Sequence, residues 1–213
     1  MKSENKELRH QARETLKGKW GTAVSCYAIY VLFLLLTTAI SAGTEGGTNI
    51  SVEILQLILG GPFSLGFSIF SLSLARGQEA SFSQIFEGFK RFGVAVGAYF
   101  LMTLFIILWA LLLIIPGIIA ALAYSQTFYI LADNKSIGAM EAIDASKKMM
   151  YGNKEQYFAL ILYFALLIIL SVFTLGIALF WIFPYMSVTL AKFYNEVKEP
   201  QVHEDLTLIP LHQ

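Results

Sequence analysis

Residues 93–132 read GVAVGAYFLMTLFIILWALLLIIPGIIAALAYSQTFYILA and contain no Asp, Glu, Lys, Arg or His. At 1.5 Å per residue, a single helix of this length would measure about 60 Å, roughly twice the hydrocarbon core of a bilayer. The segment Ile115-Pro116-Gly117 near its middle favours a turn, because proline cannot continue helical hydrogen bonding and glycine adopts turn conformations readily. The stretch therefore predicts two membrane spans, at about 94–114 and 117–132, joined as a helical hairpin.

The whole chain shares this apolar character. Of its 213 residues, 56% are hydrophobic and 14% are charged, against about half and a quarter in ordinary soluble domains. Fifteen basic and fifteen acidic residues cancel, so no overall charge recruits nucleic acid. The single cysteine, Cys26, excludes an intrachain disulfide and is expected to pack as a small apolar residue. Composition thus favours a membrane protein.

Other uncharged stretches predict four further spans, at about 21–42, 54–75, 156–173 and 176–194. Gly60-Gly61-Pro62 should break or kink the second span near one end. Residues 156–191 exceed one span, and they divide most simply at Phe173-Thr174-Leu175-Gly176. The polar residues 196–213 are predicted to form a disordered cytoplasmic tail.

The first apolar stretch has an alternative interpretation. A basic leader followed by Ala39-Ile40-Ser41-Ala42 loosely resembles a signal peptide with its small-residue cleavage site. The uncharged run from Trp20 to Thr44 is longer than the apolar region of about 7 to 15 residues that signal peptides carry, and it matches a span. An uncleaved first span is therefore the favoured interpretation.

Three connecting segments combine basic residues with apolar residues at helical spacing. The apolar sets are Leu8, Ala12, Leu16 and Trp20 in residues 1–19; Phe82, Ile85, Phe86, Phe89 and Phe92 in residues 81–92; and Ile137, Met140, Ile143 and Met150 in residues 137–151. These segments are too charged to span a membrane, so they are expected to form amphipathic helices in the headgroup plane or beneath the bundle. For residues 1–19, a solvated positive leader that only sets topology is the alternative.

Lysine and arginine occur only in every second connection. Along the chain they number 6 before the first span, then 0, 3, 0, 4 and 0 in successive connections, and 2 from the end of the last span onward. Because Lys and Arg are retained on the cytoplasmic side, this alternation predicts six spans with both termini inside. The sequence therefore predicts an all-α polytopic membrane domain over residues 1–195, built as three hairpins. Either parallel repeats or convergence on one hairpin pattern would produce this arrangement.

The residues needed for catalysis or metal binding do not come together in the predicted spans. The histidines, His10, His203 and His212, lie in terminal segments, while Glu53 and Asp133 stand at span ends. No serine has a histidine or lysine at membrane depth to act as its base, and there is no glycine-rich nucleotide loop. The sequence thus predicts no catalytic residue, metal ligand or cofactor, and the protein is expected not to be an enzyme.

A few uncharged polar residues remain at membrane depth. They are Gln56, Tyr124, Ser125, Gln126, Thr127, Tyr185, Ser187 and Thr189. They would either line a polar cavity or hydrogen-bond helices together, and the second use is the commoner one in membrane bundles.

Four motifs carry a resemblance to a known family. They are Ile114-Ile115-Pro116-Gly117 through Tyr124-Ser125, Glu141-Ala142-Ile143-Asp144-Ala145-Ser146, Met150-Tyr151-Gly152-Asn153-Lys154, and Leu175-Gly176-Ile177 through Phe183-Pro184-Tyr185 to Lys192-Phe193-Tyr194. From Glu7 to about Val197 the chain resembles the bacterial integral membrane proteins called domain of unknown function 975. It is more faintly similar to the membrane domain of some glycerophosphodiester phosphodiesterases. The resemblance implies six spans in a bacterial inner membrane and, since the family has no established activity, transfers no catalytic residue.

These features favour a non-enzymatic inner-membrane protein that binds lipid or a partner protein, including a second copy of itself. Its three amphipathic segments would form a collar on the inner leaflet, where basic faces carrying Lys17, Arg91 and Lys148 favour anionic headgroups by about 1 kcal/mol per residue. The alternative is a small transporter or permease for a neutral or amphiphilic solute, since proton coupling needs a titratable group on the pathway. An intramembrane enzyme is least supported, because no base is available.

Overall fold

The structure, a computed structural model, describes residues 4–42 and 50–207, and these form helices and turns without a strand. The α-helices are α1 Asn5–Leu16, α2 Trp20–Ala42, α3 Ile50–Ala75, α4 Phe92–Leu112, α5 Ile114–Tyr124, α6 Thr127–Asp133, α7 Ala139–Met149, α8 Lys154–Leu170 and α9 Leu179–Thr207. Two 3₁₀ helices are η1 Phe82–Arg91 and η2 Ser171–Thr174. Four described helical stretches are long and apolar enough to cross a membrane: Ile54–Ala75, Phe82–Leu112, Ile114–Asp133 and Lys154–Thr174. The predicted all-α class is confirmed.

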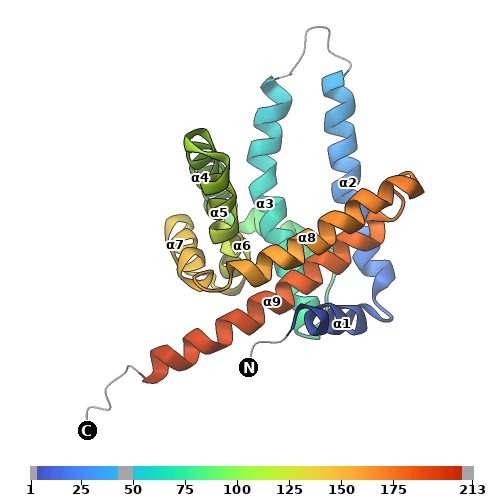
Figure 1. The fold of residues 1–213 in the computed structure, drawn as a ribbon. Coiled ribbons are helices and arrows are strands. Elements are labelled where there is room, and N and C mark those ends of the chain that lie inside the picture. The colour runs from blue at the N-terminus through green and yellow to red at the C-terminus, as the bar shows by residue number, and fades with distance from the viewer. Residues whose placement is uncertain (1–3, 43–49, 208–213) are drawn as a thin grey trace.

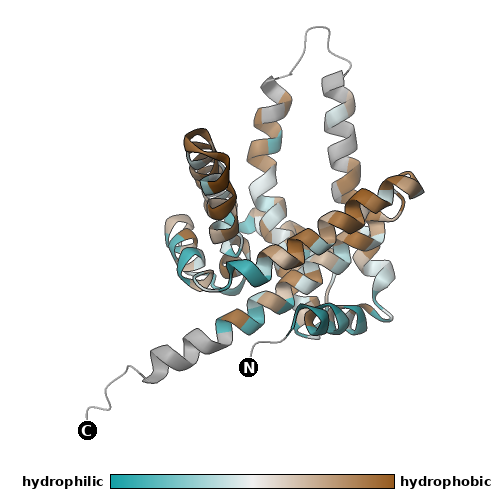
Figure 2. Ribbon diagram, in the orientation of Figure 1, coloured by the Kyte–Doolittle hydropathy of each residue, from teal (hydrophilic) through white to brown (hydrophobic). Residues whose placement is uncertain are grey.

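The helices are arranged around α3, which contacts α4, α6, α9 and η1. Figure 1 shows α2 and α3 side by side, with α4, α5 and α6 beyond α3. The α8 and α9 helices lie obliquely across the lower part of this group, and α1 lies under α9. Figure 2 shows hydrophilic residues on α1 and α7, whereas apolar residues cover α4, α5 and much of α8.

The α1 helix packs on the bundle through the face that its periodicity predicts. Leu8, Ala12 and Leu16 are buried and join a hydrophobic core that includes Phe193 of α9. Gly18 follows with φ of 75° and turns the chain from α1 into α2. Apolar side chains every fourth residue therefore fix α1 against protein, with its charged side chains directed outward.

The turn between α4 and α5 falls at Leu113, earlier than predicted. Leu113 is extended, with φ of −163° and ψ of 146°, and this ends one helix and begins the next. Pro116 then stands in the first turn of α5, where its missing N–H costs nothing because first-turn N–H groups have no helical partner. Gly117 lies against α4, since a Cβ there would be 2.8 Å from the Cβ of Ala110. The helix ends at 112 and 114 thus lie two and three residues before the approximate boundaries predicted at 114 and 117.

The α3 helix is continuous through Pro62, so the chain does not break there, and the kink predicted as the other possibility stays a prediction. Neighbouring backbone approaches α3 on both sides of this proline. A Cβ on Gly61 would stand 2.6 Å from the carbonyl carbon of Ala95, and one on Gly66 would stand 2.6 Å from that of Ile85. The two glycines let α4 and η1 pack directly on α3, and close packing by neighbours is what allows proline inside a membrane helix.

Residues 82–91 form a 3₁₀ helix, and this changes which side chains share a face. With three residues per turn, Ile85 and Gly88 come to the same side, and both are buried. Phe82, Phe86 and Phe92 are 39%, 47% and 43% exposed. The predicted apolar face is thus divided between a contact with α3 and an outward aromatic surface.

The apolar face predicted for residues 137–151 is confirmed in part, because Ile143 and Met150 are 1% and 0% exposed and Ile137 packs against the core. Ala142, Ile143 and Ser146 are buried together with Met149, whereas Met140 is 49% exposed. Because α7 begins at Ala139 and is surrounded by α4, α5 and α6, its small residues face those helices.

The α9 helix continues past the end of the apolar stretch. The turn predicted at Gly176 is confirmed, because Leu175 and Gly176 have φ of 52° and 82°. The helix then extends to Thr207, past the start of the tail predicted at 196, while 208–213 lie outside the described residues. Val197 is buried, and such contacts extend the helix beyond the span predicted at 176–194.

Candidate functional site

The polar residues predicted at membrane depth near position 125 stand at a break between two helices. The α5 helix ends at Tyr124 and α6 begins at Thr127, so the span predicted at 117–132 is not one helix. Gln126 and Thr127 are both 0% exposed. Backbone groups freed by a buried break must find partners within the protein.

Ser146 of α7 supplies those partners. Its hydroxyl donates to the carbonyl oxygen of Ala123 at 2.8 Å and accepts from the N–H of Gln126 at 3.1 Å. In an unbroken helix both backbone groups would bond within the helix. The fully buried Ser146 side chain therefore replaces hydrogen bonds that the break removes, and two motifs distant in sequence meet here.

The other side chains at the break also bond to nearby protein groups. Thr127 donates to the carbonyl oxygen of Tyr124 at 2.7 Å, and Ser125 donates to that of Leu122 at 2.9 Å. The Gln126 amide donates to the Ser125 hydroxyl at 3.0 Å. These side chains thus bond within the packed helices, while the Oε1 of Gln126 is buried and has no partner among the described residues.

The polar residues predicted in α9 behave in the same way. Ser187 and Thr189 donate to the carbonyl oxygens of Pro184 and Tyr185, at 3.0 and 2.8 Å. The hydroxyl of Tyr129 in α6 donates to the carbonyl oxygen of Ser187 at 3.2 Å. Polar groups of α6 and α9 thus hold these two helices together.

We expect the Ser146→Ala variant to lose stability. The substitution leaves the N–H of Gln126 and the carbonyl of Ala123 buried without a partner, which costs about 1–2 kcal/mol. The measurement is the melting temperature of the purified protein in detergent, with Ser83→Ala, an exposed serine, as the control. Equal melting temperatures for the two variants would show that the break does not depend on Ser146.

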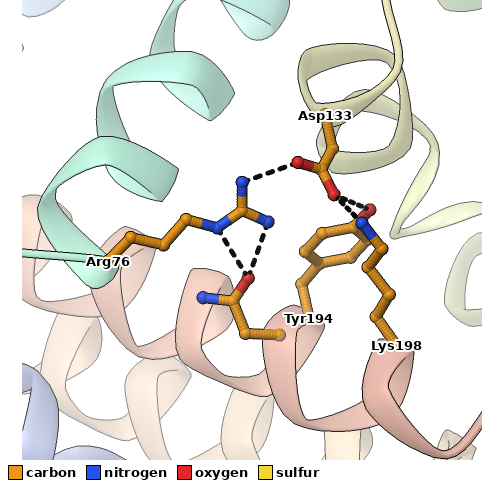
Figure 3. Close-up of polar contacts among 5 residues, drawn as sticks. Arg76, Asp133, Tyr194 and Lys198 are labelled. Atoms are coloured by element: carbon orange, nitrogen blue, oxygen red, sulfur yellow. Dashed lines mark hydrogen bonds and ion pairs between the residues drawn. The ribbon is translucent and has the colours of Figure 1, made fainter. Parts of the chain in front are cut away.

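A second polar arrangement joins the C-terminal ends of α3 and α6 to the middle part of α9 (Figure 3). Asp133 accepts from Arg76 Nη1 at 2.6 Å through one carboxylate oxygen. Its other oxygen accepts from Lys198 Nζ and from the Tyr194 hydroxyl, the latter at 3.1 Å. Arg76 also donates from Nε and Nη2 to Asn195 Oδ1, at 3.2 and 3.0 Å. We call these five residues the Asp133 cluster.

The Asp133 cluster is partly shielded from water. The side chain of Asp133 is 11% exposed, while those of Arg76 and Lys198 are 32% and 42% exposed. The hydrogen bond to Asp133 raises the pKa of Arg76. Because both carboxylate oxygens are occupied, Asp133 serves to pair charges and join helices.

The sequence did not reveal this cluster, because its members come from distant segments. Asp133 is 57 residues from Arg76 and 65 from Lys198. The sequence offered one signal. Arg76, Asp133 and Lys198 each follow an apolar stretch, and the alternation of basic and uncharged connections places these three positions on the same side of the membrane.

Arg91 forms a third set of polar contacts, which joins two of the segments that connect predicted spans. Its Nη1 donates to the carbonyl oxygens of Leu131 and Asn134 at 2.7 and 3.1 Å, and its Nη2 donates to that of Ile137 at 2.6 Å. The side chain therefore fastens η1 to the loop before α7. The sequence pattern predicts Arg91 on a lipid-binding face, but its guanidinium donates to three carbonyl groups of the protein.

The remaining basic side chains at this end include three exposed lysines, Lys17, Lys90 and Lys148. Lys17 directly follows α1, whereas Lys90 belongs to η1 and Lys148 to α7. Lys17 also pairs with Glu14 at 2.7 Å, and both side chains are exposed. In the parts of the chain that the structure describes, no three His, Cys, Asp or Glu side chains form a group fit for a metal ion.

Comparison with protein families gives one result. The family model described as "Protein of unknown function (DUF975)" matches residues 1–121 and 111–201. The comparisons with curated proteins and with solved structures found no match. The fainter resemblance to glycerophosphodiester phosphodiesterases therefore stays a prediction.

Proposed function

The chain belongs to the family described as protein of unknown function DUF975, and we propose that it is a non-enzymatic inner-membrane protein that binds anionic lipid at its basic end. In this proposal α2, α3, α4, α5 with α6, α8 and α9 are six spans, paired as three hairpins, and both termini are cytoplasmic. The alternation of basic and uncharged connections supports this orientation. Four of the proposed spans lie in stretches long and apolar enough to cross a membrane.

The proposal rests on one observation: basic connecting segments that are distant in the sequence contact one another in the structure. Arg76 follows α3, and Lys198 lies near the end of the described chain, yet both contact Asp133. Arg91 bonds to the segment before α7. Three of the four segments that contain lysine and arginine are thus gathered together, as expected if they face one leaflet.

Lipid binding at this end is assigned to the exposed lysines. Arg76 and Arg91 are engaged within the protein, whereas Lys17 after α1, Lys90 in η1 and Lys148 in α7 are exposed. Near an anionic membrane surface, each contributes about 1 kcal/mol. Exposed Phe82 and Phe86 stand on the same 3₁₀ helix as Lys90, and aromatic side chains favour the headgroup region.

Lipid binding is favoured over transport because of how the polar groups are used. The hydroxyl groups of Ser125, Thr127, Ser146, Ser187 and Thr189 donate to nearby backbone, and the Gln126 amide donates to Ser125 while its Oε1 has no described partner. Such bonding supports a packed bundle with its binding surface at the membrane face.

The test compares lysines replaced by glutamine with lysines replaced by arginine. We expect phosphatidylglycerol to raise the melting temperature of the wild-type protein in detergent by several degrees more than phosphatidylcholine does. One kcal/mol shifts the melting temperature of a chain of this size by about 2–4 °C. The combined Lys17→Gln, Lys90→Gln and Lys148→Gln variant should lose most of this difference.

The matched control carries Lys17→Arg, Lys90→Arg and Lys148→Arg, and it should retain the difference because the charges remain. The proposal fails if phosphatidylglycerol stabilises the Gln and Arg variants equally, or does not stabilise the wild-type protein selectively.

A further inference from the structure

A cavity of about 350 Å³ lies between the start of α2 and the loop that joins α3 to η1. Lys19 and Thr22 line it from the α2 side, and Leu74, Glu79 and Ser81 line it from the other side. The lining thus combines two opposite charges with two hydroxyl groups and an apolar wall at Leu74. We call this space the Lys19–Glu79 cavity.

The Lys19–Glu79 cavity lies at the level of the inner headgroups in the proposed orientation. Leu74 is one residue before the end of α3 at Ala75, and Lys19 directly precedes α2. Lys19 ends the basic segment before the first span, and Glu79 belongs to the basic connection that begins at Arg76. Both helices therefore reach the cavity with their cytoplasmic ends.

The two charges of the cavity come from different segments and are not paired with each other. Among the described lining residues, Lys19 supplies the positive charge and Glu79 the negative charge. The described ion pairs do not join them. Lys19 is half-buried and Glu79 is exposed. Each charge is therefore available to a ligand that enters the cavity.

Hydrogen bonds hold the loop that carries Glu79. The Gln84 amide donates to the backbone carbonyl oxygen of Glu79 at 3.3 Å and to the Ser73 hydroxyl at 3.1 Å. Gly77 turns the chain with φ of 71°, and the N–H of Gln78 donates to the carbonyl oxygen of Ser73 at 2.9 Å. The loop is thus fastened to α3 and η1, which keeps the Glu79 carboxylate at the cavity.

We propose that the Lys19–Glu79 cavity binds the headgroup of a zwitterionic aminophospholipid such as phosphatidylethanolamine, with its phosphate at Lys19 and its ammonium at Glu79. The inference rests on the membrane position given by the proposed function, and it adds a second lipid class without net charge. The positive end of the α2 dipole lies on the Lys19 side and favours the phosphate there. The primary ammonium has three N–H donors, for which Glu79 and the Ser81 hydroxyl offer acceptors.

The arrangement of charges distinguishes this headgroup from two others. Phosphatidylcholine carries the same charges, but its quaternary ammonium has no N–H to donate. Phosphatidylglycerol carries a phosphate without a cation, so Glu79 would lie near that phosphate without a partner. Because a charge-assisted hydrogen bond is stronger than a neutral one, phosphatidylethanolamine should bind better than either of these lipids.

The surface beside the cavity favours a lipid over a soluble phosphoethanolamine compound. Ser81 is followed by η1, in which Phe82 and Phe86 are 39% and 47% exposed and have ring centroids 5.6 Å apart. These rings offer apolar contact to the glycerol and acyl parts of a lipid whose headgroup occupies the cavity. Aromatic side chains also favour this level of a membrane.

The test measures which lipid stays bound to the protein. Purified protein is equilibrated in detergent micelles with equal amounts of phosphatidylethanolamine and phosphatidylcholine of matched acyl chains, and native mass spectrometry gives the ratio of bound lipids. We expect about fivefold more phosphatidylethanolamine, which corresponds to about 1 kcal/mol from an exposed charged contact. Glu79→Gln should bring the ratio close to one. The control Glu155→Gln changes an exposed glutamate outside the described lining and should keep the ratio.

Glu79→Lys gives a result that simple loss of structure would not produce. It makes both charges positive, so this variant should retain phosphatidylglycerol in preference to phosphatidylethanolamine. Equal retention of the two zwitterionic lipids by the wild type, equal ratios in Glu79→Gln and Glu155→Gln, or an unchanged preference in Glu79→Lys would overturn the proposal. Displacement of the bound lipid by an equal concentration of soluble phosphoethanolamine would reject a lipid as the ligand.

The two lipid-binding proposals can fail separately. The combined Lys17→Gln, Lys90→Gln and Lys148→Gln variant should keep its preference for phosphatidylethanolamine, because the described lining of the cavity does not include these lysines. Selective heat stabilisation by phosphatidylglycerol without that preference would leave the proposed function standing and reject the cavity. The preference without the heat stabilisation would reject anionic-lipid binding and support the cavity.

Discussion

Gly66→Ala is expected to lower the stability of the protein by about 3 kcal/mol. A Cβ at position 66 would overlap the carbonyl oxygen of Ile85 and stand 2.6 Å from its carbonyl carbon. Backbone atoms cannot rotate away as a side chain can, so η1 must separate from α3. Overpacking usually costs 1–3 kcal/mol, and a backbone clash belongs at the upper end. The measurement is the melting temperature in detergent, which should fall by roughly 6–12 °C.

The matched control is Gly93→Ala at the start of α4. A Cβ there has no atom within 4 Å, and alanine is a better helix former than glycine by about 0.5–1 kcal/mol. This variant should be as stable as the wild type or slightly more stable. Similar melting temperatures for Gly66→Ala and Gly93→Ala would contradict the close contact between α3 and η1.

Removing the carboxylate of Asp133 should have an effect of similar size. In Asp133→Ala, Arg76 and Lys198 lose their shared acceptor, and two positive charges face each other at the junction of three helices. Breaking a buried pair costs about 3–5 kcal/mol. Both cations are partly exposed and regain some hydration, so we expect about 3 kcal/mol, measured as the free energy of unfolding or the shift in melting temperature.

The control for this variant is Asp144→Ala, which removes the exposed partner of Lys147 and should change stability by less than about 0.5 kcal/mol. If both aspartate variants melt at the same temperature as the wild type, the Asp133 cluster does not hold the helix ends together.

The lengths of the apolar stretches predicted which segments are helical better than they predicted the residues at which each helix begins and ends. The α2 helix, Trp20–Ala42, agrees closely with the predicted span because charged or glycine-rich segments bound it. The turn at Leu113 was missed because proline is compatible with the first turn of a helix as well as with a break. The sequence around 116 therefore located the turn only to within a few residues.

The break between α5 and α6 was harder to predict because its cause is distant. Residues 124–127 include polar side chains but no proline or glycine, so nothing local ends the helix. The hydroxyl that satisfies the break comes from Ser146, 20 residues from Gln126. Likewise, the internal use of Arg91 depends on carbonyl groups up to 46 positions away, and a charge pattern alone cannot distinguish such an arginine from a lipid-facing one.

The side of the membrane on which each connection lies tests the account most directly. In a Cys26→Ser background, cysteines are placed singly at Thr48, which lies outside the described residues, and at Tyr151, whose side chain is 87% exposed. Tyr151 is preferred to Asn153, which is buried and bonds to Met149. An impermeant thiol reagent should label the Thr48→Cys protein from outside intact cells and the Tyr151→Cys protein only after permeabilisation. The reverse pattern, or labelling of both from one side, would contradict the proposed orientation.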